Sequence, residues 1–303
     1  MFARVLYPTD FGEYAWPNLA CVLESLPTCR EVILVHIVDV EKLQHNLLPA
    51  YVAEDEARIR DLAEQTFERW TRDLKARGME ARWFLPTGVP SGEVLKVARQ
   101  QHPDLIVVGK QSRSRVLERY LNATSEGVLK GAECPVLVTK YHVVAELGPE
   151  ECEQICGRMF QRVLYATDWS QVAEDALRLV RHLRDLGTEK VVAVHVLDRG
   201  LLGHVSAEQA EEYARRDQER LDELARRLRF HGLSVETRFR IGKAPEEIQR
   251  EAEVRGIHLV VMGYVGRSGW RNAVWGSTTE RVVRHTAQAV LVIKGASTGT
   301  TTR

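Results

Sequence analysis

The residues with the clearest chemical meaning form a pattern of glycines and hydroxyls near the carboxyl end of the chain. The apolar run 259–262 leads into Gly263-Tyr264-Val265-Gly266, and after nine further residues Gly276-Ser277-Thr278-Thr279 opens an amphipathic stretch. Glycine lets the backbone approach an anion because it has no Cβ, and the N-terminus of a helix carries partial positive charge. The pattern therefore predicts a loop that holds a polyphosphate.

The hydroxyls in this pattern have a second interpretation. Ser277 and Thr278 would supply donors for a phosphate, but hydroxyl residues at the start of a helix also serve as N-caps. The three glycines Gly263, Gly266 and Gly276, in a strand-to-helix setting, favour phosphate binding over capping alone. Neither Gly-Lys-Ser nor Gly-Lys-Thr follows these glycines, so the pattern is distinct from a Walker A loop.

An internal repeat organises the chain. Residues 5–10, Val-Leu-Tyr-Pro-Thr-Asp, return as residues 163–168, Val-Leu-Tyr-Ala-Thr-Asp. Residues 109–140 align without gaps to residues 263–294, and ten of the thirty-two aligned positions are identical. A length of 303 residues is about twice that of a usual domain. The sequence therefore predicts two similar domains in tandem.

Each copy alternates short apolar runs with longer amphipathic stretches, which is typical of βαβ units around a parallel sheet. The second copy has five predicted strands, at residues 162–166, 190–196, 234–240, 259–263 and 289–293. A run of apolar residues at helical spacing ends before Gly232, and a matching first-copy run ends before Gly78. We expect two α/β domains, each a doubly wound five-stranded parallel sheet with its ligand crevice at the carboxyl ends of the strands.

Breaks in the pattern set the expected boundaries. The first domain is predicted at residues 1–140 and the second at residues 161–294. Residues 141–160 lack the strand and helix pattern and are expected to form a linker. Residues 295–303 consist mainly of glycine, serine and threonine and are expected to be a disordered tail.

The second copy resembles the ATP-binding universal stress proteins in its motif Gly263-x2-Gly266-x9-Gly276-Ser277, preceded by Thr167-Asp168 after the first strand. The resemblance implies a Rossmann-like fold of the adenine-nucleotide alpha-hydrolase type, and it covers both halves of the chain. It also implies that the adenosine end of the nucleotide is lined by Ala166, Thr167, Asp168, Val196 and Met262. The glycines, Ser277 and Thr278 would then hold the phosphates.

Three positions carry alternative interpretations. Asp168 follows a strand and could cap the helix expected near Gln171 as well as contact a ligand. His36 and His195 stand at equivalent places after apolar runs and are expected to be structural histidines. No residue is predicted to be catalytic, and no metal ligand is assigned.

The first copy departs from the glycine motif. Its aligned residues are Gly109-Lys110-Gln111-Ser112 and Asn122-Ala123-Thr124-Ser125, so two of three glycines are replaced. Ala123 also lacks the hydroxyl that Ser277 offers. Asn122 can adopt the left-handed conformation, and Lys110, Arg113 and Arg115 could attract an anion. The first domain is expected to be structural or regulatory.

Bulk composition excludes several classes of protein. Hydrophobic residues make up 44% of the chain and charged residues 28%, and 42 basic side chains balance 42 acidic ones, which gives no support for nucleic-acid binding. No run approaches the ~20 apolar residues of a membrane span, and the first residues do not resemble a signal peptide. We expect a cytoplasmic protein whose five cysteines, spaced without a CxxC, are reduced thiols.

These observations predict an ATP-binding regulatory protein of the stress response. ATP is the expected ligand, with AMP or ADP as alternatives, and Mg²⁺ is the natural ion if one accompanies the phosphates. The resemblance implies that the two domains pair as an intramolecular pseudo-dimer. Assembly of two chains into a homodimer is a further possibility, and the sequence does not identify a regulatory protein partner. A slow ATPase and a nucleotide-independent scaffold are the alternative functions.

Overall fold

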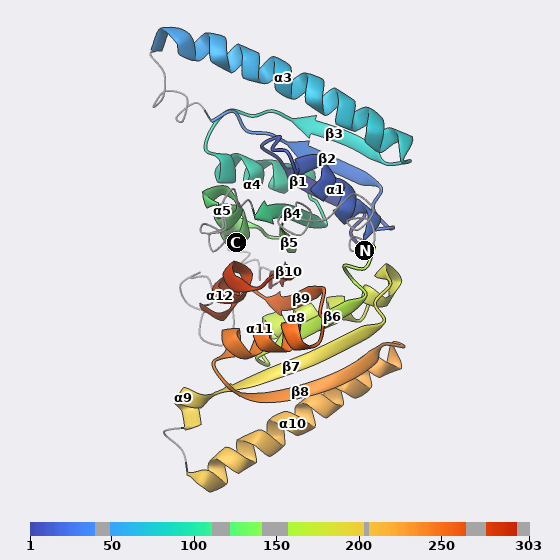
Figure 1. Ribbon diagram of the computed structural model, residues 1–303, viewed down its shortest axis with the longest axis vertical. Coiled ribbons are helices and arrows are strands. Elements are labelled where there is room, and N and C mark those ends of the chain that lie inside the picture. The colour runs from blue at the N-terminus through green and yellow to red at the C-terminus, as the bar shows by residue number, and fades with distance from the viewer. Residues whose placement is uncertain (40–48, 111–121, 141–156, 203–205, 265–276, 296–303) are drawn as a thin grey trace, which may run out of the picture. The chain divides into compact units, whose positions relative to one another are not determined.

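The computed structural model describes residues 1–39, 49–110, 122–140, 157–202, 206–264 and 277–295. The chain divides into two compact units, Met1–Glu153 and Gln154–Arg303, which we describe separately. Figure 1 shows the helices and strands of each unit.

The first unit has a parallel sheet whose strands follow the spatial order β3-β2-β1-β4-β5. The strands are β1 (Arg4–Pro8), β2 (Glu31–Val35), β3 (Glu80–Phe84), β4 (Leu105–Lys110) and β5 (Val136–Lys140). The helices are α1 (Ala15–Glu24), α3 (Pro49–Ala76), α4 (Pro90–Gln101) and α5 (Ala123–Gly131).

The second unit repeats this arrangement, with the spatial order β10-β9-β6-β7-β8 and all pairs parallel. Its strands are β6 (Arg162–Thr167), β7 (Lys190–Asp198), β8 (Ser234–Gly242), β9 (Leu259–Gly263) and β10 (Ala289–Ile293). Its helices are α8 (Gln171–Val180), the 3-10 helix η1 (Leu183–Leu186), α9 (Arg199–Leu202), α10 (Ala207–Phe230), α11 (Ala244–Val254) and α12 (Ser277–His285).

The predicted α/β class and the doubly wound parallel sheets are confirmed. The predicted bounds of β9 and β10 match the structure, whereas β7 and β8 each extend two residues beyond expectation. The extension has a physical cause, because β7 and β8 pair residue for residue from Lys190↔Ser234 to Asp198↔Gly242. Each added residue is therefore held by the ladder of backbone hydrogen bonds.

The buried apolar residues of α10 and the residues at its two ends explain why this long helix forms. Helix α10 buries Leu221, Leu224, Ala225 and Leu228, which recur at helical spacing. It begins with a capping box between Ser206 and Gln209. Gly232 follows its end with a φ of +76°, a conformation that glycine adopts without steric cost. Among the described helices, none combines the length and apolar composition needed to cross a bilayer.

One expectation about the cysteines is wrong. Cys21 is disulfide-bonded, whereas Cys29 and Cys134 are not. A disulfide requires two Cα atoms within about 7 Å of each other, a condition set by the fold. The spacing of cysteines along the chain therefore did not reveal it.

Candidate functional site

The predicted crevice lies where the strand order of the second unit reverses. Strand β6 has β7 on one side and β9 on the other, and all three strands run parallel. Their carboxyl ends therefore share one edge of the sheet (Figure 1). The chain passes from β6 to β7 and β8 on one side and then returns to β9 on the other side of β6. Doubly wound sheets form their ligand crevice at such a point.

The turn after β6 is ordered by its own side chains. The backbone N–H of Trp169 donates to the Thr167 hydroxyl at 3.1 Å, and the N–H of Ser170 donates to Asp168 Oδ1 at 3.0 Å. Trp169 has a φ of +64°, an uncommon conformation for a residue with a side chain. Ser170, whose hydroxyl accepts from the N–H of Ala173, is the N-cap of α8. The alternative interpretation of Asp168 as the helix cap is therefore wrong.

The neighbouring strands β7 and β9 bring three further predicted residues to the same edge, beside Ala166 of β6. The pair Thr167↔His195 sets the register of β6 and β7, so Val196 is the next residue of β7. The pair Tyr165↔Val261 sets the register of β6 and β9, so Met262 and Gly263 lie level with Ala166 and Thr167. Ala166 and Met262 are buried, at 8% and 5% exposure. The residues predicted from the strand ends thus come together, with Asp168 between the ends of β7 and β9.

Gly263 has a packing role that the sequence did not reveal. A Cβ atom at this position would lie 3.0 Å from Cγ1 of Val172 and 3.4 Å from the backbone nitrogen of Ala173. Both contacts belong to the first turn of α8. The absence of a side chain at Gly263 therefore lets α8 begin close to the end of β9.

Helix α12 begins beside this edge. Ser277 is exposed, Thr278 is partly exposed and Thr279 is buried. The Thr279 hydroxyl donates a 2.9 Å hydrogen bond to the carbonyl oxygen of Gly263. Sequence reasoning missed Thr279, although its first-copy counterpart Ser125 also bears a hydroxyl. The predicted residues Gly266 and Gly276 lie outside the described residues.

Tyr264 directly follows Gly263 and is 8% exposed. Its ring contacts the Lys294 ammonium group, with Nζ 3.1 Å from the ring centroid. Its hydroxyl is buried and has no hydrogen-bond partner among the described atoms. Burial, and to a lesser extent the nearby Glu280 carboxylate, raises the pKa of Tyr264, so this side chain stays neutral near neutral pH.

His195 is buried behind the turn, as the structural interpretation predicts. Its Nδ1 lies 2.8 Å from the Thr167 carbonyl oxygen, and its ring packs against Trp169 with centroids 4.9 Å apart. Its Nε2 lies 3.2 Å from Oδ2 of Asp217 on α10. The guanidinium of Arg220, also on α10, lies 4.3 Å from the ring centroid of Trp169.

The first unit repeats the turn. The N–H of Phe11 donates to the Thr9 hydroxyl and the N–H of Gly12 donates to Asp10 Oδ1, both at 3.0 Å. Phe11 has a φ of +57°, close to that of Trp169. The first copy therefore keeps the strand-end turn although its glycine motif is degenerate.

Asn122 does not have the left-handed conformation that the sequence permitted. It is extended, with φ −67° and ψ 157°, and its side chain accepts from the N–H of Ser125 at 2.7 Å. Asn122 is therefore the N-cap of α5, a role that satisfies a backbone donor. The Ser125 hydroxyl donates to the Gly109 carbonyl at 3.2 Å, which matches the bond between Thr279 and Gly263. Arg113 and Arg115 lie outside the described residues.

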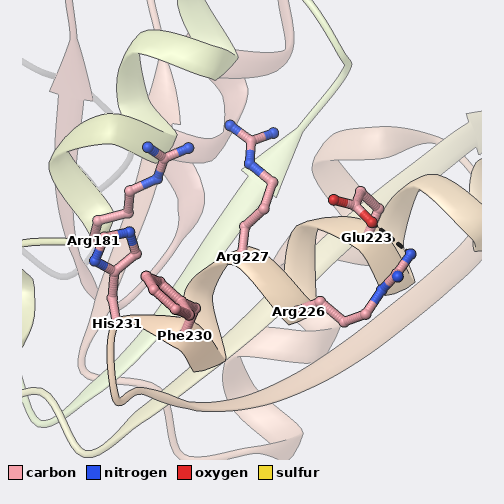
Figure 2. Close-up of a pocket in the computed structure, with 6 residues that line it drawn as sticks. All are labelled: Arg181, Glu223, Arg226, Arg227, Phe230 and His231. Carbon is pink, nitrogen blue, oxygen red and sulfur yellow. Dashed lines mark ion pairs between the residues drawn. The ribbon is translucent and has the colours of Figure 1, made fainter.

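Two hollows of the second unit lie away from the predicted crevice. The first, of about 360 Å³, is drawn in Figure 2 and is lined by Arg181, Glu223, Arg226, Arg227, Phe230 and His231. The second lies near the starts of β6 and β9 and includes Arg162 and His258. Helices α8 and α10 begin near the carboxyl ends of the strands and run toward the amino ends. The first hollow is lined by residues at the C-terminal ends of these helices, so it also lies at the amino edge of the sheet. Arginines at helix C-termini also stabilise the terminal carbonyl groups, so this cluster needs no ligand to explain it.

Known proteins support this architecture. The crystal structure of a universal stress protein from Archaeoglobus fulgidus DSM 4304 aligns with a TM-score of 0.72 at 22% identity and covers 97% of both chains, which shows the fold. Universal stress protein MJ0577 of Methanocaldococcus jannaschii is 28% identical over 156 residues, 46% of this chain and 96% of that protein. Universal stress protein Slr1230 of Synechocystis sp. is 27% identical over 192 residues, 63% of this chain and 58% of that protein.

The family model gives the widest match. The model of the universal stress protein family matches residues 1–140 and matches again at residues 159–294. Both matched regions contain a complete five-stranded sheet. The chain therefore belongs to the universal stress protein family and carries two of its domains in tandem.

Proposed function

We propose that the second domain binds ATP at the carboxyl edge of β6, β7 and β9, and that the chain is a cytoplasmic, nucleotide-dependent regulator of the stress response. One observation carries this proposal. The Thr167-Asp168 turn stands between the ends of β7 and β9, next to the first turn of α12, which Thr279 fastens to Gly263. This arrangement supports the proposal, because a carboxylate and a helix N-terminus lie at the same edge of the sheet.

The two sides of this crevice suit different parts of a nucleotide. The partly exposed Asp168 can accept hydrogen bonds from ribose hydroxyls, as acidic residues do at the switch points of doubly wound sheets. The first backbone N–H groups of α12, together with Ser277 and Thr278, can donate to phosphate oxygens. ADP and AMP would make fewer contacts with α12, so ATP should bind most tightly. Mg²⁺ is the divalent ion that suits these phosphates.

The first domain has a different proposed role. Its α5 begins with Ala123, where α12 begins with Ser277, and its N-cap Asn122 already occupies the N–H of Ser125. Fewer donors at this helix start therefore face any anion. We assign nucleotide binding to the second domain and a structural or regulatory role to the first.

An intramolecular pseudo-dimer is part of the proposal. Within its own unit, each of β5 and β10 has one neighbouring strand, and an edge strand offers unsatisfied backbone groups to another strand. Amide hydrogen exchange of the full chain tests this pairing. Slow exchange on both sides of β5 and β10 is expected, whereas rapid exchange of their outward-facing amides would contradict it. Native mass spectrometry of the same sample determines whether two chains form a homodimer.

The decisive experiment compares the two copies of the turn. Asp168→Ala and the matched control Asp10→Ala remove the same carboxylate from turns of the same geometry. Titration calorimetry of wild type should give about one ATP per chain, and Asp168→Ala should weaken binding about tenfold, the loss of one charge-assisted hydrogen bond. Asp10→Ala should leave binding unchanged. Absence of ATP binding would contradict the proposal. Two sites of equal affinity, one lost in Asp168→Ala and the other in Asp10→Ala, would also contradict it.

Steady phosphate release from the ATP complex tests whether the protein also turns ATP over. The proposal expects a stoichiometric complex with no sustained release. Release that continues over many turnovers and disappears in Asp168→Ala would instead favour the slow ATPase.

A further inference from the structure

His195 connects the long helix α10 to the Thr167-Asp168 turn. One ring nitrogen, Nδ1, lies 2.8 Å from the Thr167 carbonyl oxygen, and the other, Nε2, lies 3.2 Å from Oδ2 of Asp217. Both side chains are largely buried, with 7% of His195 and 13% of Asp217 exposed. The three residues therefore form a continuous polar bridge from the covering helix to the residue that precedes Asp168.

The two contacts of the His195 ring make different demands on its protons. A carbonyl oxygen only accepts hydrogen bonds, so Nδ1 of His195 must carry a proton. A carboxylate oxygen also accepts, so a second proton must lie between Nε2 and Asp217 for the 3.2 Å contact to be attractive. A proton shared between Nε2 and Asp217 would make both contacts of the His195 ring attractive at once.

The first domain has the same histidine without a carboxylate at the position that corresponds to Asp217. His36 Nδ1 lies 2.8 Å from the Thr9 carbonyl oxygen, and its ring packs on Phe11. The sequences of α3 and α10 can be aligned through Gly78 and Gly232, which both have positive φ. In this alignment Ala63 corresponds to Asp217. Burial lowers the pKa of His36, which is consistent with a neutral ring.

The other groups around His195 are few. The turn contributes Asp168 and the Trp169 ring, and α10 contributes Arg220, whose guanidinium lies over that ring. Strand β8 contributes the uncharged ring of Phe239, 6.2 Å from the imidazole between centroids. Asp217 is the carboxylate that contacts the His195 ring, with Oδ2 3.2 Å from Nε2.

We propose that Asp217 is a positioning residue for the nucleotide turn, and that the proton it shares with His195 makes ATP affinity dependent on pH. This inference rests on the proposed ATP site. With the proton in place, Asp217 holds the imidazole against the Thr167 carbonyl, which orients the peptide before Asp168. Loss of the proton leaves a carboxylate facing a ring nitrogen lone pair, so the bridge opens and the turn loosens. ATP affinity in the second domain therefore falls as pH rises.

Nuclear magnetic resonance of full-length protein labelled with ¹⁵N-histidine tests the proton directly and needs no nucleotide. His195 should show two protonated ring nitrogens near neutral pH, and His36 should show one, with His195→Gln and His36→Gln used for assignment. A neutral His195 ring whose signals match those of His36 would overturn the proposal.

Three variants test the coupling to ATP. Asp217→Asn can donate its amide N–H to an unprotonated Nε2, so it should keep the bridge and remove the pH dependence. Asp217→Ala reproduces the first-domain residue Ala63 and should weaken ATP binding about fivefold near neutral pH, a typical coupling between two sites. Asp222→Asn makes the same charge change at an exposed position of α10 and should retain the wild-type pH profile.

The phosphate groups of ATP also change protonation with pH, but this contribution is the same for every variant. It therefore cancels when the affinities of two variants are compared at the same pH. Wild-type behaviour in Asp217→Ala, or an unchanged pH profile in Asp217→Asn, would overturn the positioning role. Failure of wild type to bind ATP at any pH would refute the proposed function and the coupling together. The histidine spectra would then still decide whether the buried pair holds the proton.

Discussion

The hydroxyl of Thr279 donates a 2.9 Å hydrogen bond to the carbonyl oxygen of Gly263 and so fastens the first turn of α12 to the end of β9. In the first unit, the Ser125 hydroxyl makes the corresponding bond to Gly109 at 3.2 Å. Because both copies have this bond whether or not their glycine motif is intact, it belongs to the fold. In the second unit it holds the first turn of α12, whose N–H groups we propose to bind phosphate.

Replacement of Thr279 should therefore affect both stability and binding. Thr279→Val keeps the volume but leaves the Gly263 carbonyl without this donor, and it should lower the free energy of unfolding by about 1 kcal/mol. ATP binding should weaken because the first turn of α12 loses its fixed orientation. Thr279→Ser, which copies the first domain, should restore both. Urea denaturation and calorimetry provide the two measurements.

The control for this prediction lies in the other copy. Ser125→Ala removes the equivalent bond and should destabilise the first domain without a change in ATP affinity. Equal losses of ATP affinity in the Ser125 and Thr279 variants would contradict the assignment of binding to the second domain.

Much of the fold could be predicted because its signals are local or repeated. The strands follow from apolar runs, and the tandem arrangement follows from the return of the Val-Leu-Tyr-x-Thr-Asp segment. The edge of the candidate site could also be predicted, since parallel strands end together. The N-cap of α8 could not be assigned, because Asp168 and Ser170 both have capping side chains and only the turn geometry distinguishes them.

Contacts between distant segments could not be predicted. Asp217 lies in a helix whose sequence is rich in charged residues, as expected for an exposed helix. No residue near Asp217 in the sequence indicates its contact with His195. Similarly, the sequence shows that Gly263 matches a glycine of the phosphate motif. It does not show that Gly263 lies close to Val172, because that contact depends on how α8 packs. Such features depend on tertiary packing, which periodicity along one segment does not describe.

The buried carboxylate of Glu251 should stabilise the second domain. It is 3% exposed and accepts from Arg240 at 2.7 Å and from Arg255 at 2.6 Å. Burial opposes its ionisation, but these bonds outweigh burial and lower the pKa of Glu251. Glu251→Gln leaves the two guanidinium groups without their shared anion and should cost about 2 kcal/mol, less than for a fully buried pair because both arginines are partly exposed.

Urea denaturation of Glu251→Gln against Glu253→Gln, an exposed control on the same helix, measures this cost. The contribution of Glu251 should be complete above the ordinary carboxyl pKa of about 4.3 and should be lost as pH falls through its lowered pKa. A loss no greater than that of the Glu253 variant would show that solvent screens the cluster.

Mild acid should weaken the first domain through His36. Burial lowers the pKa of His36, so below about pH 6.5 the unfolded chain binds a proton that the folded chain does not. The free energy of unfolding should therefore fall as pH drops from about 6.5 through the lowered pKa. His36→Gln cannot titrate, yet its amide can still donate to the Thr9 carbonyl. Calorimetric scans at several pH values should show a smaller fall in Tm for this variant than for wild type.

The last prediction separates the two roles of Gly263. In Gly263→Ala, the new Cβ would lie 3.0 Å from Cγ1 of Val172, so the start of α8 must shift, and overpacking of this kind costs about 1 to 3 kcal/mol. Val172→Ala in the same chain removes that methyl group and should recover most of the stability lost, with Val172→Ala alone as the reference. Urea denaturation of the four proteins measures the interaction between the two positions.

ATP affinity of the same four proteins then tests whether Gly263 also serves the nucleotide. If Gly263 matters only because α8 packs against it, the double variant should bind ATP as tightly as Val172→Ala. If the backbone at Gly263 must also approach a phosphate, the added Cβ should continue to weaken binding after stability has recovered. We expect the second result, since Gly263 ends β9 beside Thr167, and β9 precedes α12 in the chain.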